Sequence, residues 1–239
     1  MDQHFWNDSY RQDPDQVMVV DRILDQELRD LPVGTALDLG CGSGLNALKL
    51  SEAGWSVVGV DWAERAIEIA TRSALERGLG AIFHVGDVTT WDPAEQFDLV
   101  ISTYALPGGR DSELALGTAQ RALAPGGTLL VAEWDRSMAE AWGLAEGDLL
   151  SPQETAELLP ELDIEKAEVR HLQDMFPSDD DPRALHGSSV KVAVVRARRP
   201  LTNGGARRTV GPGRQMMDAG RRTVDAGRSA QPADGSGDK

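Results

Sequence analysis

Short apolar runs alternate with amphipathic stretches through the first 200 residues of the chain. Each run has the length of a buried strand, and most lead into apolar residues at three- and four-residue spacing, which indicates a helix. Strands that alternate with helices form parallel sheets covered on both faces. The pattern predicts strands over residues 35–39, 56–60, 81–85, 97–102, 128–133, 163–171 and 188–197, and helices over residues 45–53, 63–77, 112–123 and 151–159.

A further helix is expected before the first strand, and a hairpin between the last two. Asp13-Pro14 supplies a capping acid and a proline suited to a first helical turn. The apolar face of this helix carries Val17, Val20, Leu24, Leu28 and Leu31. Residues 172–187 show no helical face, so the last strand should run antiparallel. The expected fold class is α/β: a Rossmann-like, doubly wound sheet of seven strands, mostly parallel with an antiparallel last strand.

Composition separates one domain, residues 1–200, from a tail. Residues 201–239 are rich in Gly and Arg and lack apolar periodicity, so we expect a disordered tail, either a solvated extension or an Arg-rich docking segment. Acidic residues outnumber basic ones by 39 to 24, for a net charge of −15, which argues against a nucleic-acid partner.

Nothing in the sequence indicates a membrane or an oxidising compartment. The chain has neither a leader-like start nor an apolar run approaching the roughly 20 residues of a membrane helix. Its single cysteine, Cys41, excludes an internal disulfide. A cytoplasmic location without a membrane partner is therefore expected. The oligomeric state stays open.

A glycine-rich turn follows the first predicted strand. Asp38 stands two residues before Gly40, Gly42 and Gly44, and a second apolar run ends in Asp61, 17 residues after Gly44. A turn without Cβ atoms lets a ligand approach the main chain closely. The spacing Gly-x-Gly-x-Gly differs from the dinucleotide pattern Gly-x-Gly-x-x-Gly.

This ordered set resembles the cofactor site of class I S-adenosylmethionine-dependent methyltransferases, over about residues 30–200. The resemblance implies that Asp38 and the three glycines hold the methionine portion of S-adenosylmethionine, and that Asp61 binds both ribose hydroxyls. A carboxylate can accept two such bonds at once. The other cofactor contacts that we expect are Trp62 against adenine, Asp87 and Val88 of Gly86-Asp87-Val88 beside the adenine amine, and Ser102 after the fourth strand.

Each of these residues also has a purely structural interpretation. Asp38 and Asp61 could be acids at helix N-termini, Trp62 could be core, and Gly86-Asp87 could be an ordinary turn. Ala63 departs from the Ser or Thr that many relatives use to cap the following helix.

The N-terminal segment His4-Phe5-Trp6-Asn7-Asp8-Ser9-Tyr10 resembles the short lid of small-molecule members of the family. It also resembles the Trp-Asx-x-x-Tyr opening of the tellurite-resistance and thiopurine-type branch, so residues 1–33 are expected to form a lid and a helix. Aromatic residues expected to line the acceptor site, unless they are simply core, are Trp6, Trp134, Trp142 and Phe176. Such a lining suits a flat heterocycle, a thiol or a chalcogen.

Candidates for orienting or deprotonating the acceptor are Tyr104 and His186. Tyr104 follows the fourth strand, where the Asn/Asp-Pro-Pro-Tyr element of nucleic-acid amine methyltransferases is missing. No metal-ligand spacing appears in the sequence. The acidic run Asp179-Asp180-Asp181 is more typical of a solvated loop than of a metal site.

The sequence therefore predicts methyl transfer from S-adenosylmethionine to a small-molecule acceptor by direct in-line displacement, with S-adenosylhomocysteine as product. The alternatives are a protein methyltransferase and a non-catalytic, S-adenosylmethionine-binding regulatory protein.

Overall fold

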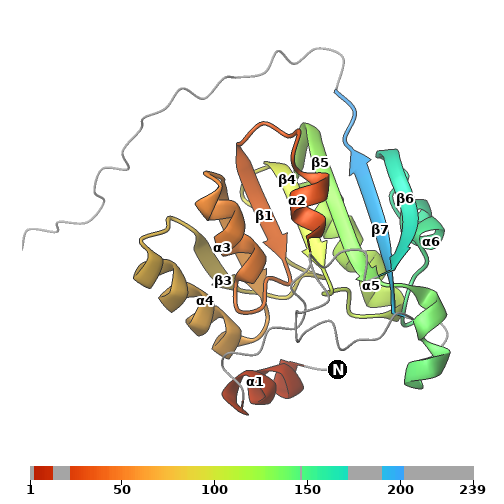
Figure 1. Ribbon diagram of the computed structural model, residues 1–239, viewed down its shortest axis with the longest axis horizontal. Helices are drawn as coiled ribbons and strands as arrows, with labels where there is room; N and C mark the ends of the chain where they lie inside the picture. Colours follow the sequence, from red (N-terminus) through yellow and green to blue (C-terminus); the bar gives the residue numbers. More distant parts are fainter. Residues whose placement is uncertain (1–2, 13–21, 146, 172–189, 202–239) are drawn as a thin grey trace, which may run out of the picture. The chain divides into compact units, whose positions relative to one another are not determined.

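The computed structural model describes residues 3–12, 22–145, 147–171 and 190–201. These ranges belong to one compact unit, Met1–Asn203. Its centre is a seven-stranded sheet in the order β3-β2-β1-β4-β5-β7-β6 (Figure 1). The strands are β1 (Thr35–Leu39), β2 (Ser56–Asp61), β3 (Ile82–Val85), β4 (Phe97–Thr103), β5 (Leu123–Trp134), β6 (Asp163–His171) and β7 (Lys191–Arg198).

The strand directions confirm the predicted fold class. β1 pairs in parallel with β2 and β4, and β4 pairs in parallel with β5. β7 is antiparallel to both of its neighbours, β5 and β6. The predicted antiparallel last strand is therefore present.

Helices cover both faces of the sheet (Figure 1). They are α1 (Gln3–Gln12), α2 (Ile23–Glu27), α3 (Leu45–Glu52), α4 (Glu64–Arg77), α5 (Gly109–Ala122) and α6 (Pro152–Glu157), with short 3-10 turns η1 (Arg136–Met138) and η2 (Glu140–Trp142). Alternate residues along the strands serve two cores. Ala36 packs with residues of α2 and α3 on one face, and Leu37 packs with residues of α5 on the other.

The largest differences from the predicted boundaries lie at α2 and β5. Of the helix expected from Asp13, residues 13–21 lie outside the described part, and the described α2 ends at Glu27. Leu28 and Leu31 nevertheless pack against the core as the pattern predicted. β5 begins at Leu123 rather than at residue 128, because Leu123 already pairs with Phe97 and the ladder continues across a register shift.

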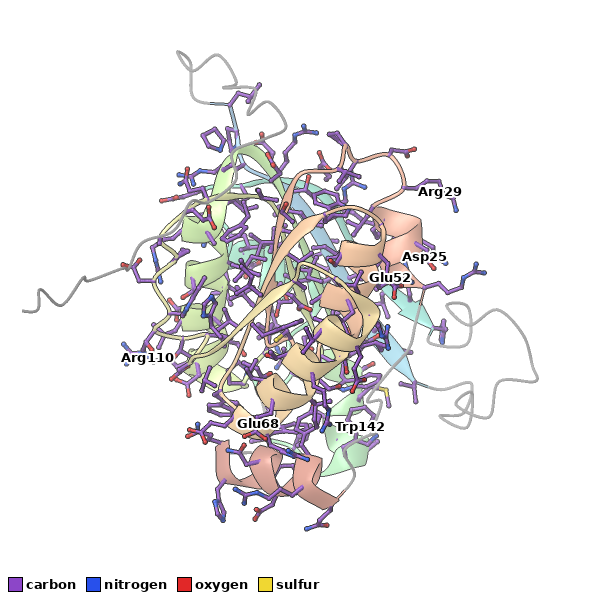
Figure 2. The ribbon with its side chains drawn as sticks, turned by 90° about the vertical axis from the view of Figure 1, so that its left-hand side faces the viewer. Asp25, Arg29, Glu52, Glu68, Arg110 and Trp142 are labelled. Atoms are coloured by element: carbon purple, nitrogen blue, oxygen red, sulfur yellow. The ribbon has the colours of Figure 1, made fainter. Side chains whose placement is uncertain are left out.

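The carboxyl ends of the parallel strands lie at one edge of the sheet, and α1 lies at this edge (Figure 1). Trp142 and Glu68 lie at the same end of the domain, whereas Asp25, Arg29 and Glu52 lie toward the opposite end (Figure 2). Ligands in open α/β sheets bind at the carboxyl edge. The fold therefore brings the described residues of the predicted site together at this edge.

Candidate functional site

A cavity of about 610 Å³ lies at the carboxyl ends of β1, β2, β4 and β5. This volume is within the range of small-molecule sites. The residues predicted from the sequence that line it are Trp6, Asp38, Gly40, Gly42, Asp61, Trp62, Asp87, Val88, Tyr104, Trp134 and Trp142.

Two of the predicted residues that the structure describes, Ser102 and Gly44, are not part of this lining. Ser102 is buried within β4. Gly44 precedes α3 with a φ of +85°, and a Cβ atom there would lie 2.8 Å from the Cβ atom of Ala70, so packing explains this glycine. Phe176 and His186 lie outside the described residues.

Asp61 links the glycine turn to the start of α4. Its Oδ2 accepts a hydrogen bond from the backbone N–H of Gly42 at 2.9 Å, and its Oδ1 accepts one from that of Ala63 at 2.8 Å. Burial raises the pKa of Asp61, and these two amides oppose the rise. Each oxygen has a second lone pair, so the carboxylate can still accept bonds from a ligand.

Asp38 is a buried acid beside the glycine turn. It is 1% exposed, and neither carboxylate oxygen has a hydrogen-bond partner among the described residues. Burial raises its pKa to about 7, with a further contribution from the negative charge of Asp61. An unpaired buried carboxylate is costly, so this position suits a ligand that carries a positive charge.

Asp87 shapes its own turn as well as lining the cavity. Its Oδ1 accepts hydrogen bonds from the backbone N–H and the hydroxyl of Thr89, at 2.8 and 2.7 Å. Its carbonyl accepts from the backbone N–H groups of Thr90 and Trp91. One carboxylate oxygen of Asp87 therefore stabilises its own turn, as the structural interpretation expects. Asp87 also lines the cavity, where the predicted contact with a ligand would form.

Three aromatic residues that line the cavity, Tyr104, Trp134 and Trp142, contact one another and form an aromatic wall. The ring centroids of Tyr104 and Trp134 are 4.5 Å apart, and those of Trp134 and Trp142 are 5.4 Å apart at an interplanar angle of 82°. Tyr104 has a φ of +54°, the one positive value at a non-glycine position in the described ranges. Such strain is held by the surroundings and is concentrated at functional sites.

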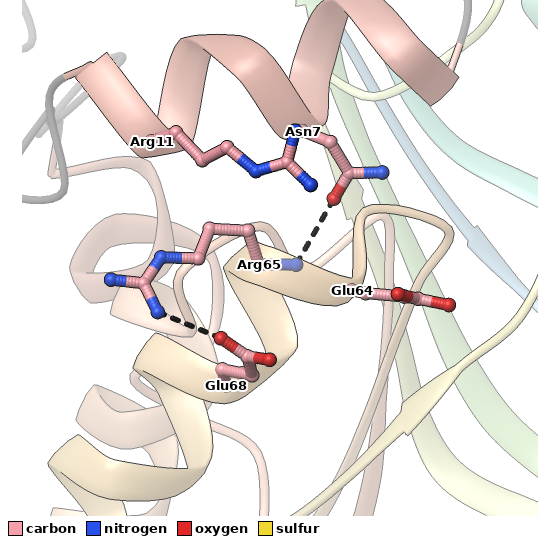
Figure 3. A pocket seen from close by; sticks show the side chains of 5 residues that line it. All are labelled: Asn7, Arg11, Glu64, Arg65 and Glu68. Carbon is pink, nitrogen blue, oxygen red and sulfur yellow. Dashed lines mark hydrogen bonds and ion pairs between the residues drawn. The ribbon is translucent and has the colours of Figure 1, made fainter.

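Helix α1 covers the start of α4. The side-chain oxygen of Asn7 accepts a hydrogen bond from the backbone N–H of Arg65 at 3.1 Å (Figure 3). Gln3 donates to the carbonyl of Trp62 at 2.6 Å. Ala63 gives α4 no side-chain cap. Asn7 supplies the missing acceptor from a different helix.

Tyr10 and Glu133 are among the lining residues that the sequence analysis missed. Tyr10 is buried, and its hydroxyl lies beside the space that a side chain at Gly42 would fill. It ends the Trp-Asx-x-x-Tyr opening and could have been found from it. Glu133 is 6% exposed, and burial raises its pKa to about 8. Glu133 ends a predicted apolar strand as Asp61 does, so the same local signal could have found it.

Comparison with known proteins agrees with this geometry. Residues 36–127 match the family model described as a methyltransferase domain. The ubiquinone biosynthesis O-methyltransferase of Paramagnetospirillum magneticum is 34% identical over 111 residues, which cover 46% of this chain and 44% of that protein. The demethylmenaquinone methyltransferase of Thermus thermophilus is 40% identical over 111 residues, 45% of this chain and 50% of that protein.

Residues 36–127 of this chain form a methyltransferase domain, and its glycine turn and cavity match the class I S-adenosylmethionine-dependent methyltransferases. The resemblance seen in the sequence is thus confirmed, and the cofactor of this methyltransferase is S-adenosylmethionine. The matched region spans about half the length of these curated relatives.

Solved structures share the fold of this methyltransferase. The N-methyltransferase NodS from Bradyrhizobium japonicum, in complex with S-adenosylhomocysteine, has a TM-score of 0.58 at 22% identity, over 75% of this chain and 84% of that one. TehB from Haemophilus influenzae has a TM-score of 0.60 at 17% identity, over 81% of this chain and 67% of that one.

Two features are missing from the described residues. No described helix of this methyltransferase is long and apolar enough to cross a membrane. Within the same ranges, no group of three or more His, Cys, Asp or Glu side chains is placed to hold a metal ion. The acidic run Asp179-Asp180-Asp181 lies outside them.

Proposed function

We propose that this protein transfers a methyl group from S-adenosylmethionine to a small-molecule acceptor by in-line displacement. The observation that carries the proposal is one cavity lined by two chemically different groups of residues. Asp38 and Asp61 contribute carboxylates beside the glycine turn, and Tyr104, Trp134 and Trp142 contribute aromatic rings. Such a cavity can hold two reactants in contact, which supplies much of the acceleration in a displacement reaction.

The residues at the glycine turn fit the cofactor. Asp38 offers two unpartnered oxygens to the cationic methionine portion, and Asp61 keeps free lone pairs for the ribose hydroxyls. Trp62 and Val88 give an apolar surface for the adenine ring. When bound, the cofactor supplies an electrophilic methyl group on a sulfonium. Gly44 and Ser102 would then support the site from behind rather than contact the ligand.

The aromatic wall supports a flat acceptor. Stacked and edge-on rings bind planar groups well. The acceptors that suit such a wall are heterocycles, aromatic thiols and other soft nucleophiles. The names of the relatives point to O-methylation in ubiquinone biosynthesis, which adds hydroxylated rings to the acceptor classes. The position of α1 beside the cavity supports a small acceptor over a protein chain.

Calorimetric titration with S-adenosylmethionine, and separately with NAD, tests the cofactor half of the proposal. Micromolar binding corresponds to about −8 kcal/mol. We expect Asp61→Ala to weaken S-adenosylmethionine binding by about 10- to 100-fold, because hydrogen bonds to a charged group contribute about 1.5–3 kcal/mol. Glu76→Gln, on the exposed face of α4, is the matched control.

Release of S-adenosylhomocysteine with a panel of aromatic thiols, phenols and heterocycles tests the transfer half. Binding of NAD instead of S-adenosylmethionine, or an unchanged affinity in Asp61→Ala, would refute the cofactor assignment. Tight cofactor binding without turnover on any member of the panel would favour the regulatory alternative.

A further inference from the structure

Glu133 is a buried carboxylate near the end of β5 that forms no salt bridge with any residue in the described ranges. It lines the cavity, it is 6% exposed, and its Oε1 has no hydrogen-bond partner among the described residues. Another buried glutamate of the domain shows the contrast. Glu27 is 3% exposed and is paired with Lys166 at 2.8 Å and with Arg170, and these partners lower its pKa.

The difference indicates different roles for the two acids. Glu27 ties α2 to β6, and a buried pair of this kind is structural. Glu133 bears the cost of burial without such compensation, and burial raises its pKa to about 8. Titratable groups with this kind of environment in a cavity are candidates for function.

The backbone connects Glu133 with both groups of lining residues. The nearby amides of Leu106 and Ala105 partly offset its burial. A Cβ atom on Gly40 would clash with the side chain of Ala105, so the turn after β4 touches both the glycine turn and Glu133. The next residue along β5, Trp134, belongs to the aromatic wall.

We propose that Glu133 is the catalytic base that removes the proton from a hydroxyl group on an aromatic acceptor. This inference rests on the proposed function and narrows its acceptor to phenols. The acceptor O–H bond breaks and its proton goes to Glu133 Oε1. An oxygen lone pair forms the new bond to the methyl carbon, and the electron pair of the breaking carbon–sulfur bond stays on the sulfur. The carboxyl group then returns the proton to water.

Other titratable groups line the same cavity, so a test must separate their titration from that of Glu133. Asp38 comes from β1, Asp61 from β2, Tyr104 from the turn after β4 and Asp148 from the segment after η2. The β7 residues opposite the end of β5, Ala193 and Val192, are not titratable. Asp38 titrates near the same pH as Glu133, so rates must be taken at saturating cofactor and compared with Asp38→Asn.

The experiment compares Glu133→Gln with the wild-type full chain on catechol and on thiophenol. An aromatic thiol ionises without a base, whereas catechol needs one. We expect wild-type kcat on catechol to rise with pH and level off above about pH 8. Glu133→Gln should lower that kcat by about 100-fold or more and abolish the inflection, since general base catalysis contributes about 10²–10⁴-fold. The rate on thiophenol and the calorimetric affinity for S-adenosylmethionine should change less than threefold.

Glu133→Asp, which keeps a carboxylate, should restore part of the catechol rate. An equal loss on both acceptors would overturn the inference, because it would indicate a structural role. Methylation of thiophenol but not of catechol by the wild type would also overturn the inference. That result would agree with the proposed function. A wild-type chain that fails to bind S-adenosylmethionine would refute both the inference and the proposed function.

Discussion

The hydroxyl group of Tyr10 occupies the space beside Gly42: a Cβ atom added to Gly42 would stand 2.6 Å from Tyr10 Oη. Gly42 also has a φ of +52°, a left-handed conformation that side chains disfavour. Gly42→Ala should therefore lower the free energy of unfolding by about 2 kcal/mol or more, from strain and from displacement of Tyr10. Urea unfolding measures the loss, and S-adenosylmethionine affinity should fall with it.

Gly78→Ala is the control for this variant. Gly78 has a φ of +66° with nothing within 4 Å of an added Cβ atom, so only the conformational cost of about 1 kcal/mol applies. Equal destabilisation by the two variants, with cofactor affinity unchanged in both, would contradict the contact with Tyr10.

Asn7→Ala should detach α1 from the start of α4. The backbone N–H of Arg65 would lose its acceptor, and the loss of a helix cap costs about 1 kcal/mol. Hydrogen exchange should show faster exchange in α1, with a small drop in the melting temperature. Asp8→Ala on the same helix removes only exposed ion pairs and should cost under about 0.5 kcal/mol. Slow exchange of α1 in Asn7→Ala would refute the capping role.

Stability of the cofactor-free protein should fall as pH rises from 5.5 to 8.5. The folded-state pKa values of Asp38 and Glu133 are raised to about 7 and about 8, well above the ordinary carboxyl value of about 4. In this window the folded state retains protons that the unfolded state has released, so raising the pH favours unfolding until both groups have ionised.

Urea unfolding at several pH values measures this slope. Asp38→Asn should remove the part of the decline that ends near pH 7, and saturating S-adenosylmethionine should reduce the slope, because the cation would stabilise the ionised carboxylate. A stability that rises through the window would contradict the assigned burial of these acids.

Trp142→Ala should raise the KM for an aromatic acceptor several-fold and leave S-adenosylmethionine affinity unchanged. Trp142 is 43% exposed and packs edge-on against Trp134, so its removal opens the aromatic wall without a core defect. Trp142→Phe keeps a ring there and should behave close to the wild type. Steady-state kinetics and calorimetry separate the two effects, and a changed cofactor affinity would place Trp142 elsewhere in the cavity.

The local pattern of the sequence determined most of the sheet and the glycine turn. The strands predicted over residues 35–39 and 163–171 have the observed bounds of β1 and β6, because an apolar or alternating run that ends at a turn residue is a local feature. The positive φ values of Gly40 and Gly42 likewise agree with a turn that needs glycine.

Tertiary structure alone decided which distant groups meet. Asn7 caps a helix that begins more than 50 residues later, and no periodicity relates the two segments. Gly44 and Ser102 were both expected to contact the cofactor. Both are packed inside the domain and do not line the cavity. The pKa of Glu133 is raised by burial, which arises because β5 pairs with β4 and the backbone of the turn after β4 lies beside the carboxyl group. A carboxyl group takes its chemistry from its surroundings, and the order of residues specifies those only through the folded chain.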